Sequence, residues 1–299
     1  MTETRQFDLE KSTNVRFPGL VRFVMRTGSQ LAPKFAARRF ASQFLTPMRA
    51  PTPERELRWT AGASRHHVRS GDYDLAVWSA GLGGPQILLV HGWSGRGSQL
   101  GAFIEPLVRA GFEVNWFDLP AHGKSTGRQA GLVHAVEAVE RVVDWLGGVH
   151  TVVGHSMGAA ATTVAASRGA DIGRMAYLAP PDDVGSYLPI VGKMIGLSSD
   201  VIEDAQRVIE ARYGILFDDF IPTRYAACLE QPLLALHDPS DLEVSVAEVE
   251  RLVELWPDSK LHLTEGLSHR RIVRDARVVS CVVDYVSERP NGNRRRRAA

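Results

Sequence analysis

Cysteine is scarce in this chain of 299 residues. Cys228 and Cys281 are the only two, and neither has a second Cys or a His at the spacing of a metal-binding motif. A disulfide framework needs more cysteines than this, and a structural zinc site needs Cys or His ligands at close spacing. We therefore expect a protein of a reducing compartment, the cytoplasm, that binds no metal.

Long apolar runs are also missing. No uninterrupted run approaches the ~20 residues that a membrane-spanning helix needs. Asp8 and Glu10 lie where the apolar part of a secretory signal peptide would begin. Both features favour an intracellular protein.

Acidic residues are absent from one part of the chain. The net charge of +1 gives no general reason to expect a nucleic-acid partner. Residues 11–53, however, contain eight Lys or Arg and no Asp or Glu. We interpret residues 1–60 as a basic N-terminal helical extension, with two short helices that begin near Pro18 and Pro33 and pack on the body or fold over its opening. Peripheral membrane contact through residues 16–49 and an organelle transit peptide are the alternatives.

Residues 61–180 and 223–288 alternate short apolar strands with amphipathic helices. Gly71-Asp72 separates two strand-like segments, which predicts a hairpin, and valines recur at helical spacing in Leu132–Leu146. Such alternation predicts an α/β fold, a mostly parallel sheet flanked by helices. Ligands of these sheets bind at the carboxyl ends of the strands. The buried strands are expected at Ile87–Val90, Val114–Phe117, Val152–Val153, Met175–Leu178 and Leu233–Leu236.

Residues 181–222 interrupt this alternation and are too many for a simple loop. We interpret them as a small helical cap, in which Asp200 and Glu203 suit the reciprocally capped start of a helix that continues to about Tyr213. Residues 289–299 form a basic tail that we expect to be disordered. Five apolar cap residues are predicted to contact the substrate, the alternative being that they only cover the body: Leu188, Ile190, Val191, Met194 and Ile195.

A nucleophile motif follows one of the predicted strands. Gly154–Gly158 reads G-x-S-x-G between the strand Thr151–Val153 and the helix Ala159–Ser167. This strand–turn–helix context is the one in which the motif presents a serine above the sheet, and the small neighbours allow the close approach of backbone and helix. We predict Ser156 as the nucleophile.

A serine nucleophile needs a base, and the base needs a group that orients it. Two loops downstream supply both: His237–Asp241 follows the strand Leu233–Leu236, and Gly266–His269 follows the next strand. We predict His269 as the base and Asp241 as the acid. Asp238 is the first alternative acid, followed by Asp182 and Asp183. His237 and His262 are interpreted as packed histidines of the strands.

The loop after Ile87–Val90 is predicted to bind the developing oxyanion. It reads His91-Gly92-Trp93, and the main-chain N–H of Trp93, paired with that of Met157, is the expected donor set. We interpret His91 as a support of this loop, and His122 as a support of the loop that follows Val114–Phe117.

Taken together, these segments resemble the α/β-hydrolase superfamily over roughly residues 65 to 288. The landmarks are H-G-W at His91–Trp93, D-x-x-x-H-G-x-S at Asp118–Ser125, G-H-S-M-G at Gly154–Gly158 and G-x-x-H at Gly266–His269. The resemblance implies a mostly parallel eight-stranded sheet with a helical cap after the sixth strand. Where members of the superfamily often carry H-G-x-x-D, this chain has Asp238 in place of the glycine.

The expected activity is that of a serine hydrolase acting on a small-molecule carboxylic ester or thioester with a hydrophobic acyl or aryl group, through an acyl-enzyme. No cofactor is needed for this chemistry. By the same resemblance, an acyltransferase, a carbon–carbon bond hydrolase, a lyase or a haloperoxidase would use the same triad. A non-catalytic binding protein is a further alternative, but such proteins usually lack a member of the triad.

Overall fold

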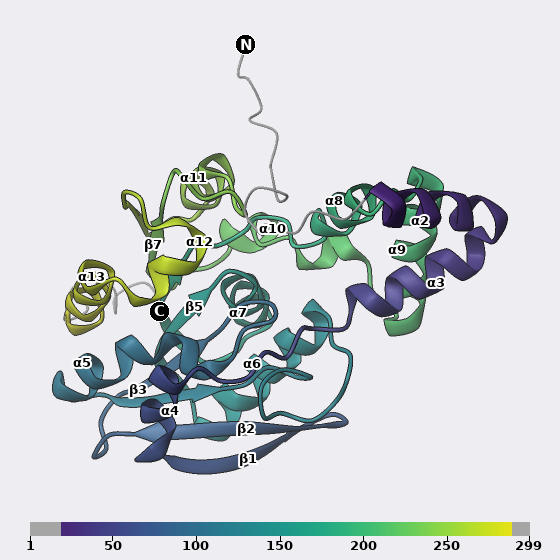
Figure 1. The fold of residues 1–299 in the computed structure, drawn as a ribbon. Helices are drawn as coiled ribbons and strands as arrows, with labels where there is room; N and C mark the ends of the chain where they lie inside the picture. The colour runs from purple at the N-terminus through teal and green to yellow at the C-terminus, as the bar shows by residue number, and fades with distance from the viewer. Residues whose placement is uncertain (1–18, 289–299) are drawn as a thin grey trace.

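A single eight-stranded sheet forms the centre of the molecule. The computed structural model describes residues 19–288, and its sheet has the order β1-β2-β4-β3-β5-β6-β7-β8 (Figure 1). β1 pairs antiparallel with β2 and β2 with β4, whereas all other pairs are parallel. The predicted hairpin and the five predicted buried strands are confirmed. The strands are β1 (Ser64–Ser70), β2 (Tyr73–Ala80), β3 (Gln86–Val90), β4 (Glu113–Phe117), β5 (Val149–His155), β6 (Ile172–Leu178), β7 (Leu233–His237) and β8 (Ser259–Leu263).

Helices cover both faces of the sheet, as the buried strands require. One face packs against α6 (Leu132–Leu146), α7 (Met157–Ser167), α10 (Thr223–Ala226) and α11 (Val246–Leu255). The other packs against the 3₁₀ helix η1 (Gly97–Phe103), α5 (Ile104–Arg109), η3 (Ile272–Arg274) and α13 (Ala276–Ser287). The predicted helix over residues 132–146 is confirmed, and its valines at helical spacing are buried.

A second, smaller apolar cluster lies outside the sheet layers. It joins α3 (Pro33–Phe44) with α8 (Tyr187–Met194) and α9 (Ser199–Tyr213), and α2 (Gly19–Leu31) packs on α3 beside it (Figure 1). The predicted reciprocal cap at Asp200 and Glu203 is wrong, because the N-cap of α9 is Ser198, which makes no side-chain capping bond. The chain returns to the sheet through the 3₁₀ helix η2 (Phe217–Phe220).

The segment between α3 and β1 is tied to loops at the carboxyl ends of the strands. The Arg49 guanidinium donates to the carbonyl oxygens of Ala121, Ser125 and Gly127. In α4 (Glu54–Ala61), the buried Glu56 accepts two hydrogen bonds from Arg96, at 2.6 and 2.8 Å. Residues of the N-terminal extension therefore hold the loop that follows β3.

Two further observations concern the ends of the chain and its helices. No helix within residues 19–288 is both long enough and apolar enough to cross a membrane. The first part of the predicted extension, residues 1–18, and the predicted basic tail, residues 289–299, lie outside the described residues.

Candidate active site

Ser156 occupies a strained turn between β5 and α7. Its backbone angles are φ 52° and ψ −125°, in a region that residues with a Cβ rarely adopt. Gly158 allows the turn to pass beneath β3, because a Cβ there would lie 2.5 Å from the carbonyl oxygen of Val90. The sequence prediction that small neighbours are needed around Ser156 agrees with this close approach.

The Ser156 side chain faces the loop that follows β3. A Cβ on Gly92 would lie 2.9 Å from the Cβ of Ser156, so only glycine lets this loop approach so closely. The Ser156 hydroxyl forms no hydrogen bond with another residue in the described part of the chain. Partly exposed and without a partner, it is available to a bound molecule.

His269 and Asp241 form a buried hydrogen-bonded pair. Nδ1 of His269 donates to Oδ2 of Asp241 at 2.8 Å. The other carboxylate oxygen accepts the main-chain N–H groups of Glu243 at 2.7 Å and Val244 at 3.1 Å. His269 lies in α12 (Ser268–Arg271), directly after the loop that follows β8, and Asp241 in the loop after β7. With Nδ1 held as the donor, Nε2 is the nitrogen left to accept a proton.

The electrostatics of this pair favour a basic histidine. Burial by itself would lower the pKa of His269, but the hydrogen bond and the charge of Asp241, together with the charge of Glu243, outweigh burial and raise it above its ordinary value. Burial would likewise raise the pKa of Asp241, yet the bonds from His269 and from two main-chain N–H groups hold it below its usual range. Asp241 is therefore a carboxylate at neutral pH.

The alternative acids have other partners. The carboxylate of Asp238 accepts from the main-chain N–H and hydroxyl of Ser240, from Thr264 and from the main-chain N–H of Leu267. It thus ties together the loops after β7 and β8. Asp182 bonds to Thr223 and Arg251, and Asp183 bonds within its own turn. Of these acids, Asp241 is the one bonded to His269.

Two main-chain N–H groups flank the serine. Trp93 lies in the loop after β3, Met157 is the first residue of α7, and neither N–H donates a hydrogen bond within residues 19–288. Both remain available to an oxyanion.

Two histidines hold the loops on this side of the site. His91 donates from Nδ1 to the carbonyl oxygen of Gly92 and accepts at Nε2 from the N–H of Leu119. His122 joins the carbonyl oxygen of Pro120 to the N–H of Ser94 in the same way. Burial lowers the pKa of His91 to about 4 and that of His122 to about 3, so both are neutral. With both nitrogens of each ring occupied, the bonds agree with the predicted supporting roles.

Sequence reasoning missed two residues. His155, next to the serine, donates from Nε2 to the carbonyl oxygen of His269 at 3.0 Å and so links the turn that carries Ser156 to the loop that carries His269. Glu243 brings a second carboxylate to the histidine, with Oε2 3.8 Å from Nε2 of His269, and it also pairs with Arg270. The sequence feature that could have indicated Glu243 is its position two residues after the predicted acid, Asp241.

The cap residues predicted to contact substrate lie in two environments. Leu188 and Ile195 are buried in the cluster shared with α3 and α9, and Val191 packs against it. Ile190 and Met194 are only partly buried.

Among the described residues, no group of three or more His, Cys, Asp or Glu side chains is arranged to bind a metal ion.

Comparisons with known proteins agree with this architecture. Residues 87–280 match the model of the alpha/beta hydrolase family. No curated protein matches the chain by sequence. An esterase from Pyrococcus furiosus has a similar structure, with 21% identity and a TM-score of 0.62, covering 81% of this chain and 97% of the other. A bromoperoxidase from Bacillus anthracis is similar over 75% of this chain and 99% of the other, with 17% identity and a TM-score of 0.58.

At these identities the structural likeness establishes the fold and leaves the substrate open. The fold class that the sequence predicted, an eight-stranded and mostly parallel sheet flanked by helices, is confirmed. The family model spans most of the chain and includes the serine turn as well as both downstream loops. The chain belongs to the alpha/beta hydrolase family.

Proposed function

We propose that this chain is a serine hydrolase that cleaves a carboxylic ester or thioester through an acyl-enzyme. The observation that carries the proposal is the 2.8 Å hydrogen bond between His269 and Asp241, on loops that His155 links to the strained turn of Ser156. A histidine whose Nδ1 is held by a carboxylate has Nε2 free to take the proton of a serine hydroxyl.

Each residue has one task in the proposed mechanism. The Ser156 oxygen attacks the substrate carbonyl while Nε2 of His269 accepts the hydroxyl proton. Asp241 holds the imidazole and stabilises the imidazolium that forms. The N–H groups of Trp93 and Met157 donate to the oxyanion, and the proton of His269 then passes to the leaving group. Water then attacks the acyl carbonyl while His269 takes a proton from it, and that proton passes to the Ser156 oxygen as its bond to the acyl group breaks and the acid leaves.

The proposed substrate is small and carries a hydrophobic acyl or aryl group. Ile190 and Met194, which are partly exposed and do not pack on the cluster of α3, α8 and α9, are the cap residues that we expect to contact it. Transfer to an acceptor other than water would use the same acyl-enzyme. Carbon–carbon bond hydrolysis, lyase and haloperoxidase chemistry remain alternatives, the last because a bromoperoxidase is among the structural neighbours.

The test separates the acyl-enzyme from the other chemistries. The full chain is incubated with p-nitrophenyl esters of increasing chain length and with acyl-thioesters, and the intact mass is measured during turnover. We expect hydrolysis and an acyl adduct on the peptide that contains Ser156. Ser156→Ala should abolish both without loss of folding.

Ser280→Ala, an exposed serine of α13, is the matched control and should keep both. If the wild-type chain hydrolyses neither substrate class and forms no adduct, the hydrolase proposal is rejected.

A further inference from the structure

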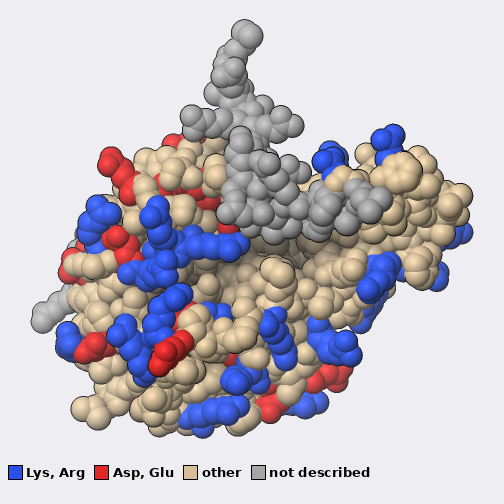
Figure 2. All heavy atoms as spheres, in the orientation of Figure 1, with Lys and Arg blue, Asp and Glu red and all other residues tan. Residues whose placement is uncertain are grey.

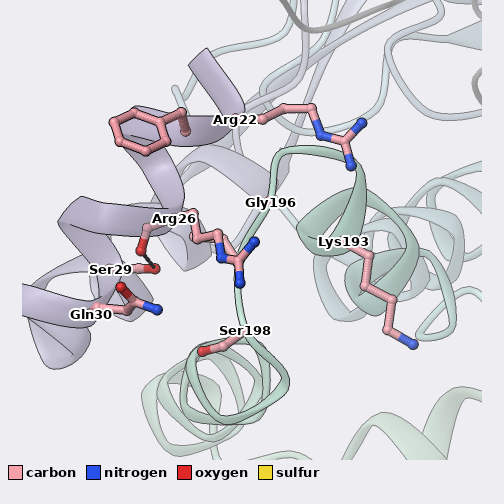
Figure 3. Close-up of a pocket in the computed structure, with 9 residues that line it drawn as sticks. Arg22, Arg26, Ser29, Gln30, Lys193, Gly196 and Ser198 are labelled. Carbon is pink, nitrogen blue, oxygen red and sulfur yellow. Dashed lines mark hydrogen bonds between the residues drawn. The ribbon is translucent and has the colours of Figure 1, made fainter. Parts of the chain in front are cut away.

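A basic hollow lies outside the candidate active site, between α2 and the turn that joins α8 to α9. It has a volume of about 560 Å³, and its charged lining residues are Arg22, Arg26 and Lys193 (Figure 3). Among the residues that the structure describes, no carboxylate lines it. The helix and the turn are closely packed, because a Cβ on Gly196 would lie 2.9 Å from the carbonyl oxygen of Arg22. The two elements that carry the three cationic residues are therefore packed together.

These cations have no counter-ion in the described part of the chain. Arg22, Arg26 and Lys193 are all exposed, and none forms an ion pair with a residue of 19–288. Arg207 on α9, by contrast, pairs with the carboxylate of Asp204. On its visible face, the lobe of α2, α3, α8 and α9 shows Lys and Arg atoms and no Asp or Glu atom (Figure 2). This face of the lobe therefore presents positive charge (Figure 2).

Large apolar side chains are exposed beside this charge. Phe23 and Leu31 of α2 are 65% and 83% exposed, and Phe35 of α3 is 72% exposed. Phe23 and Leu31 are eight residues apart, which places them on one face of the helix together with the exposed Val24. Exposed apolar side chains gathered in this way indicate an interaction surface.

Most of the circumference of α2 is uncovered. Among the side chains of α2 that the structure describes, only Ser29 is buried and Met25 partly buried, and Met25 packs against the cluster of α3, α8 and α9. Apolar and basic residues cover most of the surface of α2. Such a helix suits the headgroup layer of a membrane, because that layer surrounds a bound helix, whereas a flat protein surface would contact only one side of it. At 13 residues α2 is about 20 Å long, too short to span the ~30 Å hydrocarbon layer.

We propose that the docking surface formed by α2, α3 and Lys193 binds a bilayer containing anionic phospholipid, with a lipid phosphate group held in the basic hollow. Phe23, Leu31 and Phe35 enter the interfacial region, and the cations contact the phosphates. This inference goes beyond the proposed hydrolase activity and does not depend on it. Because α3 packs on the cap helices, docking would hold the cap at the membrane surface.

The test measures membrane binding separately from catalysis. The full-length chain is sedimented with phosphatidylcholine vesicles that contain or lack phosphatidylglycerol. We expect binding that needs the anionic lipid and weakens with salt. The triple variant Arg22→Gln, Arg26→Gln, Lys193→Gln should bind roughly 100-fold more weakly, because each basic side chain at an anionic surface contributes about a fivefold factor. Phe23→Ser with Leu31→Ser should also weaken binding.

A charge-matched control removes three exposed cations elsewhere: Arg109→Gln in α5, Arg141→Gln in α6 and Lys260→Gln in β8. This control should bind as the wild type does. The circular-dichroism spectra and melting temperatures of all three variants report whether the fold is intact. The proposal is overturned if the wild-type chain does not bind anionic vesicles, or if the control loses as much binding as the variant of the hollow.

Discussion

Replacing Glu243 with Gln is expected to make the enzyme active at lower pH. The carboxylate of Glu243 lies 3.8 Å from Nε2 of His269 and favours the protonated imidazole. Burial lowers the pKa of His269, whereas Asp241 raises it and Glu243 raises it by a smaller amount. In the proposed mechanism His269 must be neutral to take the proton of Ser156, so loss of this charge should lower the pKa of His269 and extend activity toward acid.

The magnitude follows from the distance and the surroundings. Two unit charges about 4 Å apart interact by about 1 kcal/mol in bulk water and about 4 kcal/mol near a protein surface. Glu243 also pairs with Arg270, with Oε1 3.2 Å from Nε, and this neighbour offsets part of its field at the histidine. We therefore expect the smaller value, about 1 kcal/mol, which corresponds to about a fivefold gain in kcat/KM on the acid side of the profile.

The assay is the pH dependence of kcat/KM for a soluble ester, which reports the ionisation of the free enzyme. Arg270→Gln is the matched control, because the charge of Arg270 lowers the pKa of His269. Its removal should shift the acid limb to higher pH, opposite to Glu243→Gln. The other charged or titratable neighbours of His269, namely Asp241, His155 and His237, are unchanged in both variants.

The plateau at higher pH decides between an electrostatic and a structural role. Both variants should keep the wild-type plateau, since neither changes the bond between Asp241 and His269. The reasoning is refuted if both substitutions shift the limb in the same direction. A fall in the plateau with no shift of the limb would equally refute it, because Glu243 would then act on shape alone.

Three other substitutions test the site and its supports. Asp241→Asn should lower kcat about 10⁴-fold, because the amide no longer holds His269 in the required tautomer. Asp238→Asn should mainly lower the urea midpoint of unfolding, because the bonds of Asp238 join two loops. The opposite pattern would mean that Asp238 is the catalytic acid and Asp241 the structural one. Glu56→Ala should cost about 3 kcal/mol in urea unfolding by leaving the mostly buried Arg96 unpaired; an unchanged midpoint contradicts this. Gly158→Ala should lower the melting temperature, because its Cβ would lie 2.5 Å from the carbonyl oxygen of Val90 and 2.6 Å from that of His91. An unchanged melting temperature would show that the end of β3 shifts to make room for the methyl group.

Local sequence was sufficient for the turn that carries Ser156. The G-x-S-x-G pattern lies directly between β5 and α7, so the turn could be recognised from residues a few positions away. The same holds for the hairpin between β1 and β2 and for α6. In each case the sequence pattern that predicts the element is short-range.

Choosing among the candidate acids needed the tertiary structure. Asp238 and Asp241 lie three residues apart in one loop, and sequence order allows either to orient His269. The difference lies in where each carboxylate points: Asp241 toward the imidazole, Asp238 toward Ser240, Thr264 and the main chain. Such directions depend on how two loops pack against each other, which no local pattern encodes.

By itself, the sequence determined the class of fold, the order of its strands and helices and the identity of the serine turn, because these rest on periodicity and on short-range backbone constraints. Only the tertiary structure decided that Glu243 approaches His269, that α2 and α3 pack on the cap, and that three cations gather around one hollow. These arrangements join residues far apart in the chain, and their positions follow from the packing of whole elements.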